Sequence, residues 1–129
     1  MKRTQINPWR WQDVFGFSQA WKIDGEGSLI VISGQASISA EGAVMHQGDF
    51  CAQARLTFEN LQLVLKEAGA SIGDIVKLGV YLVDMKNLLD YSAVQGEFFK
   101  GPRPAQTIVQ VSSLALPGMM IEVEAIAVI

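Results

Sequence analysis

One long amphipathic segment, residues 49–68, constrains the fold of this chain more than any other feature. Its apolar side chains recur at i, i+4, i+7, i+11 and i+14, on one helical face: Ala54, Phe58, Leu61, Leu65 and Ala68. Asp49 stands where a side chain should cap the first free amides, and Gly69 where a helix commonly ends. We therefore expect a helix here, with its apolar face covered by a sheet.

Strand-like runs lie on both sides of this helix. Residues 14–21 and 29–33 predict two strands, and the turn sequence at 24–27 predicts that they form a hairpin. Three more strands are expected at 75–83, 107–113 and 121–129, with a second helix over 87–99 that ends at Gly101-Pro102. The order ββαβαββ predicts one α+β domain over residues 1–129, with two helices on one face of the sheet. Residues 1–13 are expected to form an irregular arm, and 34–48 a loop.

The second face of the predicted sheet also needs a cover. Hydrophobic residues make up 50% of the chain, and exchanging the two tyrosines for the twelve glycines raises the apolar share to about 58%, against a typical ~45–50%. A small monomer has too little interior to hide this excess. We therefore expect an interface between copies of the chain.

Charge and cysteine content exclude several classes of protein. The net charge is −3, and the sequence holds no basic cluster that would favour nucleic acid. Cys51 is the only cysteine and His46 the only histidine, so we expect neither an internal disulfide nor a metal site. No leader-like or membrane-spanning run is evident, which predicts a soluble, cytoplasmic protein without membrane contact.

The last predicted strand carries two carboxylates on one face. Alternation along 121–128 places Glu122 and Glu124 together, and puts Ile121, Val123, Ala125 and Ala127 on the opposite face. A glutamate beside apolar surface could orient a water molecule as a general base. The alternative is a pair of edge-strand glutamates that only discourages aggregation.

Several other residues are candidates for a functional role, and two of them have two interpretations each. Gly34, at the end of a buried strand, would allow a ligand close to the backbone or simply permit a turn. Arg103, between two prolines, suits capture of a carboxylate but equally a surface ion pair. His46 is expected to be a solvated loop residue and Cys51 a small core residue, while the three tryptophans are expected to anchor packing or an interface.

Five segments, in this order, resemble the RidA/YjgF family of enamine/imine deaminases, which are also labelled L-PSP endoribonucleases. They are Ile32-Ser33-Gly34-Gln35, the helix from Gln53 through Asn60-Leu61, Gly73-Asp74-Ile75-Val76-Lys77, Arg103-Pro104-Ala105 and the strand from Glu122 to Val128. The resemblance runs from about Phe17 to the C-terminus. It implies a chorismate-mutase-like fold, a homotrimer with ligand clefts between subunits, and no cofactor. It also implies hydrolysis of imines of the 2-iminopropanoate and 2-iminobutanoate type to a 2-oxo acid and ammonia.

The family's functional residues carry over only in part. The resemblance implies that Glu122 positions the water, and that backbone at Ser33, Gly34 and Ile108 lines the cleft. The arginine that anchors the substrate carboxylate in the family is here Gln106. The family's tyrosine and asparagine correspond to Phe17 and Ser92, which complete the predicted binding residues.

Three functions follow from this comparison. The first is a Rid-like hydrolase, with a substrate altered by Gln106 and in one version lacking the α-carboxylate. The second is a non-catalytic trimer that binds a small metabolite or a protein partner in the same clefts. The third is an endoribonuclease, for which the chain lacks the usual basic and histidine groups.

Overall fold

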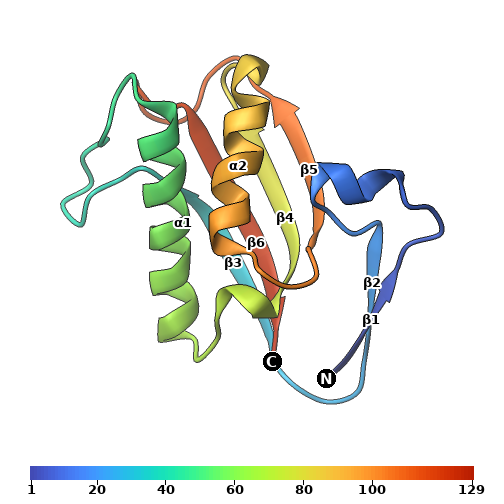
Figure 1. The fold of residues 1–129 in the computed structure, drawn as a ribbon. Coiled ribbons are helices and arrows are strands. Elements are labelled where there is room, and N and C mark those ends of the chain that lie inside the picture. The colour runs from blue at the N-terminus through green and yellow to red at the C-terminus, as the bar shows by residue number, and fades with distance from the viewer.

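The computed structural model describes residues 1–129 and is built on a four-stranded sheet in the order β3-β6-β4-β5 (Figure 1). These strands span Leu29–Ala36 (β3), Ile75–Leu82 (β4), Ala105–Gln110 (β5) and Ile121–Val128 (β6). β6 is antiparallel to both of its neighbours, whereas β4 and β5 are parallel. The mixed α+β class expected from the sequence is present, and β6 is a central strand.

Helices α1 (Phe50–Glu67) and α2 (Leu88–Phe98) cover the same face of this sheet (Figure 1). Asp49 caps α1 as predicted, because its carboxylate accepts a hydrogen bond from the Ala52 amide at 3.1 Å. Phe58, Leu61 and Leu65 are fully buried against the sheet, while Ala68 is exposed just beyond the helix end. Neither helix combines the length and apolar character needed to cross a membrane.

The N-terminal segment corrects three predictions. Its elements are β1 (Lys2–Ile6), the 3₁₀ helix η1 (Trp11–Phe15) and β2 (Ala20–Asp24), where we expected an irregular arm followed by a strand over 14–21. β2 pairs with β1 in a separate two-stranded ribbon, so the hairpin predicted between β2 and β3 was wrong. The reason is pairing at long range: β3, apolar on both faces, pairs with the central β6.

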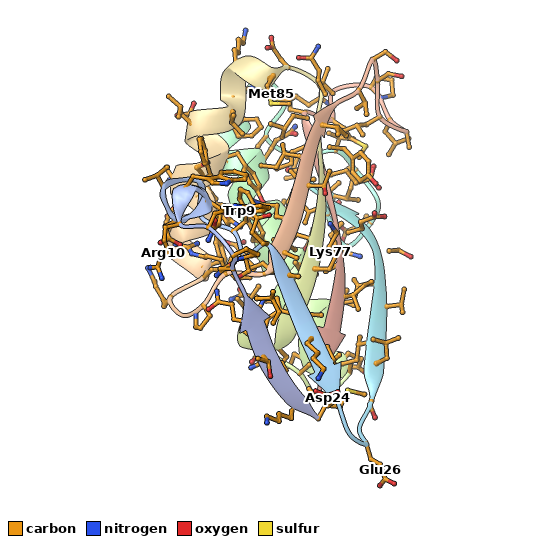
Figure 2. All side chains as sticks on the ribbon, turned by 90° about the vertical axis from the view of Figure 1, so that its right-hand side faces the viewer. Trp9, Arg10, Asp24, Glu26, Lys77 and Met85 are labelled. Atoms are coloured by element: carbon orange, nitrogen blue, oxygen red, sulfur yellow. The ribbon has the colours of Figure 1, made fainter.

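Hydrogen bonds fix the N-terminal ribbon beside β5. The amide of Ser18 donates to the Pro104 carbonyl at 2.9 Å, and the indole of Trp21 donates to the Arg103 carbonyl at 3.0 Å. The Arg3 guanidinium donates to the Gly73 carbonyl at 2.8 Å. Figure 2 shows the ribbon running from Asp24 to the turn that carries Trp9 and Arg10. The ribbon thereby places η1 next to β5 and α2.

The sheet face without helices carries exposed apolar side chains. Val31 is 74% exposed and Leu29 61%, and both belong to the edge strand β3. Polar groups interrupt this surface, where Lys77 donates to the hydroxyl of Thr107 at 3.0 Å (Lys77 is labelled in Figure 2). We call this surface the open face; one copy of the chain leaves it uncovered.

Candidate functional site

Six of the seven predicted site residues line two cavities, which lie at opposite edges of the sheet. Gly34 and Glu122 line a cavity of about 740 Å³ beside β3, which we call the β3 cavity. Phe17, Ser92, Gln106 and Ile108 line a cavity of about 450 Å³ beside β5, called the β5 cavity. Ser33 is exposed next to Gly34 and lines neither cavity.

The carboxylate of Glu122 rests against the backbone of Gly34 on the neighbouring strand. A Cβ atom built on Gly34 would fall 1.9 Å from its Oε1 atom, so only glycine leaves room for this position. The register between β3 and β6 shifts between Ile32 and Gln35, which marks a bulge at this point. The bulge and the glycine together seat the carboxylate in the β3 cavity.

Glu124 points the other way, across β4. A Cβ atom on Gly79 would lie 2.7 Å from Glu124 Oε1, and the same oxygen accepts a hydrogen bond from the Tyr81 hydroxyl at 2.9 Å. This bond and the negative charge raise the pKa of Tyr81 above its ordinary value. The two glutamates therefore do not form an acid/base pair. The edge-strand interpretation is also wrong, because β6 lies between β3 and β4.

Gln106 is held by two buried side chains of α2. Its Oε1 atom accepts a hydrogen bond from the Tyr91 hydroxyl at 2.6 Å and another from Nε2 of Gln95 at 3.0 Å. Tyr91 is completely buried and Gln95 is 1% exposed. Burial raises the pKa of the Tyr91 hydroxyl far above its ordinary value, and the nearby Arg103 charge opposes this only in part. Tyr91 thus remains a neutral donor, and the amide nitrogen of Gln106 is left without a partner in the chain.

Arg103 lies outside both cavities. Its side chain passes over Gly96 of α2, where a Cβ atom would lie 3.8 Å from the guanidinium. Its carbonyl accepts hydrogen bonds from Trp21 and from the hydroxyl of Ser18. In this chain Arg103 therefore holds the N-terminal ribbon and supplies no cation to the β5 cavity.

Sequence reasoning missed part of the β5 cavity. Trp11, Val14 and Phe15 of η1 form one wall of this cavity. The 3₁₀ turn η3 (Met85–Asn87) supplies Met85, and the first turn of α2 supplies Leu88 and Leu89. Tyr91 and Gln95 were missed as supports of Gln106, although their i, i+4 spacing places them on one face of a helix. The spacing was the available signal in the sequence. It does not show that this face of the helix meets β5.

The electrostatics of the two cavities are simple. Among all residues that line them, Glu122 is the only one with an ionisable acidic or basic side chain. Nowhere do three His, Cys, Asp or Glu side chains gather where they could hold a metal ion. His46 lies in an exposed loop, and Cys51 packs at the margin of the core.

Glu122 and Gln106 do not meet within one chain. Their strands β6 and β5 are separated by β4, a spacing of roughly 10 Å. Glu122 also lies on the open face, whereas Gln106 faces α2. The structure thus brings the predicted residues together as two groups, and a single small ligand cannot touch both groups in one copy.

Comparisons with known proteins agree with this fold. Residues 11–129 match the family model described as Endoribonuclease L-PSP. A RutC family protein of Pyrococcus abyssi is 39% identical over 111 residues, which cover 86% of this chain and 84% of the relative. A 2-iminobutanoate/2-iminopropanoate deaminase of Salmonella typhimurium is 37% identical, covering 79% of this chain and 80% of the relative.

The solved structures show the same relationship. YyfB of Yersinia pestis, described as a protein of unknown function of the Rid family, superposes with a TM-score of 0.90 at 36% identity and full coverage of both chains. The coverage of the family model and the extent of these likenesses show that this chain belongs to the L-PSP endoribonuclease family, which includes the RidA/YjgF proteins.

Proposed function

We propose that this protein is a Rid-type hydrolase that converts reactive enamines or imines into carbonyl compounds and ammonia. The observation that carries the proposal is the carboxylate of Glu122, seated against Gly34 as the one charged group of a large cavity. The relationship to a protein named as a 2-iminobutanoate/2-iminopropanoate deaminase supports the same chemistry. The proposed reaction requires no metal or organic cofactor.

The proposed reaction needs one general base and a cavity that positions the imine beside a water molecule. An enamine first tautomerises to its imine. Glu122 accepts a proton from a water molecule while the oxygen attacks the imine carbon, and the C=N π electrons move to nitrogen. The carboxyl group returns that proton to nitrogen, which gives a carbinolamine with one hydroxyl and one amino group. The Glu122 carboxylate then takes the hydroxyl proton and passes it to the amino nitrogen, the C–N bond breaks, and ammonia leaves as the carbonyl forms. One water is consumed for each ammonia released.

We propose further that the working form is a homotrimer, in which the β3 cavity of one copy faces the β5 cavity of the next. A head-to-tail contact between two different patches closes into a ring when the rotation allows it. The exposed Leu29 and Val31 of the open face support such a contact. Within the ring, Glu122 of one copy and Gln106 of its neighbour would share one ligand.

Two matched substitutions test the hydrolase. Glu122→Gln should lower ammonia release at least ~100-fold, because removal of a general base typically costs 10²–10⁴-fold. Glu124→Gln is the control, since it lies on the same strand and keeps an acceptor for Tyr81. The substrates are 2-iminopropanoate and 2-iminobutanoate generated in situ by a dehydratase, and uncharged imines generated by a flavin amine oxidase. Equal loss in both variants, or no turnover by the wild type, would refute the proposal.

The second candidate is a non-catalytic binding module, which Gln106 favours because it removes the charged anchor for a carboxylate. It predicts saturable ligand binding without ammonia release. The family description also names an endoribonuclease, but neither cavity is lined by a lysine, arginine or histidine that would hold RNA phosphates.

We propose a cytoplasmic location, because the single cysteine of the chain fits a protein that needs no disulfide bond.

A further inference from the structure

We propose that the substrate is an imine or iminium without a carboxylate group, which carries an apolar side chain and an uncharged hydrogen-bond acceptor that binds Gln106. This inference rests on the hydrolase function proposed above. It follows from three features of the β5 cavity: the fixed amide of Gln106, the apolar walls, and the absence of a cation among the lining residues.

The amide of Gln106 can present only its donor side to the cavity. Its oxygen satisfies the buried donors of Tyr91 and Gln95. Rotating the Gln106 amide by half a turn would place its NH₂ group against the Tyr91 hydroxyl and leave that buried donor without an acceptor, which is costly. The two N–H bonds of Gln106 are therefore the part that a ligand meets. A carbonyl, ester or amide oxygen complements them.

The walls of the β5 cavity suit an aliphatic or aromatic group. Eight of its ten lining residues are hydrophobic, and its volume of about 450 Å³ lies within the range of small-molecule sites. The ring of Trp11 lies edge-on to those of Phe15 and Phe17, at centroid distances of 6.4 and 5.8 Å. A flat ring or branched alkyl chain of the substrate would extend this aromatic packing.

The β5 cavity disfavours substrates with a carboxylate, because no positively charged side chain lines it. A carboxylate entering the β5 cavity would lose its hydration and gain only a neutral donor. In the proposed trimer it would also approach Glu122, the single charge lining either cavity. A protonated iminium carries the opposite charge and is attracted to Glu122. The same glutamate that activates water thus disfavours acids and favours iminium ions.

Binding of stable probes tests this preference without catalysis. The probes are 3-phenylpropanamide, 3-phenylpropanoate and propanamide, and the measurement is calorimetric titration of the whole protein at pH 8. We expect 3-phenylpropanamide to bind at least tenfold tighter than either of the others. Equal or tighter binding of 3-phenylpropanoate would overturn the proposal, and so would equal binding of propanamide.

The variant Gln106→Glu tests whether the N–H groups of Gln106 bind the ligand. The new carboxylate has the same shape and still accepts from Tyr91 and Gln95, but it offers no N–H group to the cavity. Binding of 3-phenylpropanamide should fall at least tenfold in a variant whose circular dichroism spectrum and mass in solution match those of the wild type. Unchanged binding in this variant would overturn the role given to Gln106. A second variant, Gln106→Leu, removes the donor without adding charge and should show the same loss.

Turnover separates this inference from the hydrolase proposal. The paired substrates are 2-imino-3-phenylpropanamide, made from phenylalaninamide by a flavin amine oxidase, and 2-imino-3-phenylpropanoate, made from phenylalanine by an amino-acid oxidase. We expect the uncharged imine to be hydrolysed at least tenfold more efficiently. Faster hydrolysis of the 2-imino acid, abolished by Glu122→Gln, would overturn the substrate class and leave the hydrolase standing. Amide-selective binding with no turnover of either imine would refute the hydrolase and leave the ligand preference standing.

Discussion

Glycines on the neighbouring strands decide where the two carboxylates of β6 lie. Alanine at Gly34 would put its Cβ atom on the carboxylate of Glu122, and alanine at Gly79 would do the same to Glu124. Neither glycine has a left-handed backbone, so alanine adds no backbone strain at either position. Each substitution therefore moves a flexible side chain and disturbs little else.

Gly34→Ala should consequently separate activity from stability. We expect ammonia release to fall at least ~10-fold because the displaced Glu122 no longer holds the attacking water in position. The free energy of unfolding, measured with urea, should change by less than ~1 kcal/mol. Gly79→Ala is the control and should keep activity, provided that its mass in solution equals that of the wild type. If Gly34→Ala kept full activity, the position of Glu122 against Gly34 would not matter to the reaction.

At the scale of single residues, the sequence predicts the positions of Glu122 and Gly34 in the sheet but not the surroundings of Gln106. Alternation along β6 is a local signal, and it places Glu122 on the face opposite the core. The environment of Gln106 depends on Tyr91 and Gln95, which belong to the preceding helix. A sequence pattern shows which residues share one face of a helix. It does not show which strand that face meets.

Whole elements were predictable where the signal lies within the element. α1, β4, α2 and β6 lie within one or two residues of their predicted bounds, because caps, breakers and periodicity mark their ends. β5 begins at Ala105, two residues earlier than expected. The N-terminal ribbon had no such signal: β1 is exposed at every position, and only its pairing with β2 makes it a strand.

The contact between α2 and β5 makes stability depend on pH in the alkaline range. An unfolded tyrosine loses its proton near pH 10, whereas burial keeps Tyr91 protonated well above that pH. Above pH 10 the unfolded state therefore binds fewer protons than the folded state, and the free energy of unfolding falls as the pH rises. This one group contributes at most ~1.4 kcal/mol per pH unit, and its contribution is fully present below pH ~10.

Tyr91→Phe should remove that part of the pH dependence. Urea denaturation from pH 8 to 11.5 should give a shallower decline for the variant than for the wild type above pH 10. Below pH 9 the two curves should run parallel, offset by about 1 kcal/mol for the hydrogen bond lost to Gln106. Curves that stay parallel up to pH 11.5 would show that Tyr91 ionises normally in the folded protein.

At the scale of the whole molecule, one copy holds the two groups of predicted site residues too far apart to bind one small ligand together. Glu122 lies on the open face near one edge of the sheet, and the β5 cavity lies near the other edge on the helix side. In the proposed trimer, a ring of identical copies would bring Glu122 of each copy to the β5 cavity of a neighbour. The predicted trimer and the predicted chemistry thus depend on each other.

Mixing two inactive variants tests this dependence directly. Glu122→Gln removes the base, and Ser92→Trp fills the β5 cavity from α2. Each variant alone should form a trimer without activity. When trimers assemble at random from equal amounts of the two variants, about three quarters of the trimers contain both. Each of these mixed trimers has one complete site, in which Glu122 comes from one copy and the open β5 cavity from the next. Co-expression should therefore restore about a quarter of the wild-type activity per subunit. A site contained within one chain would give none, because every chain carries one of the two defects.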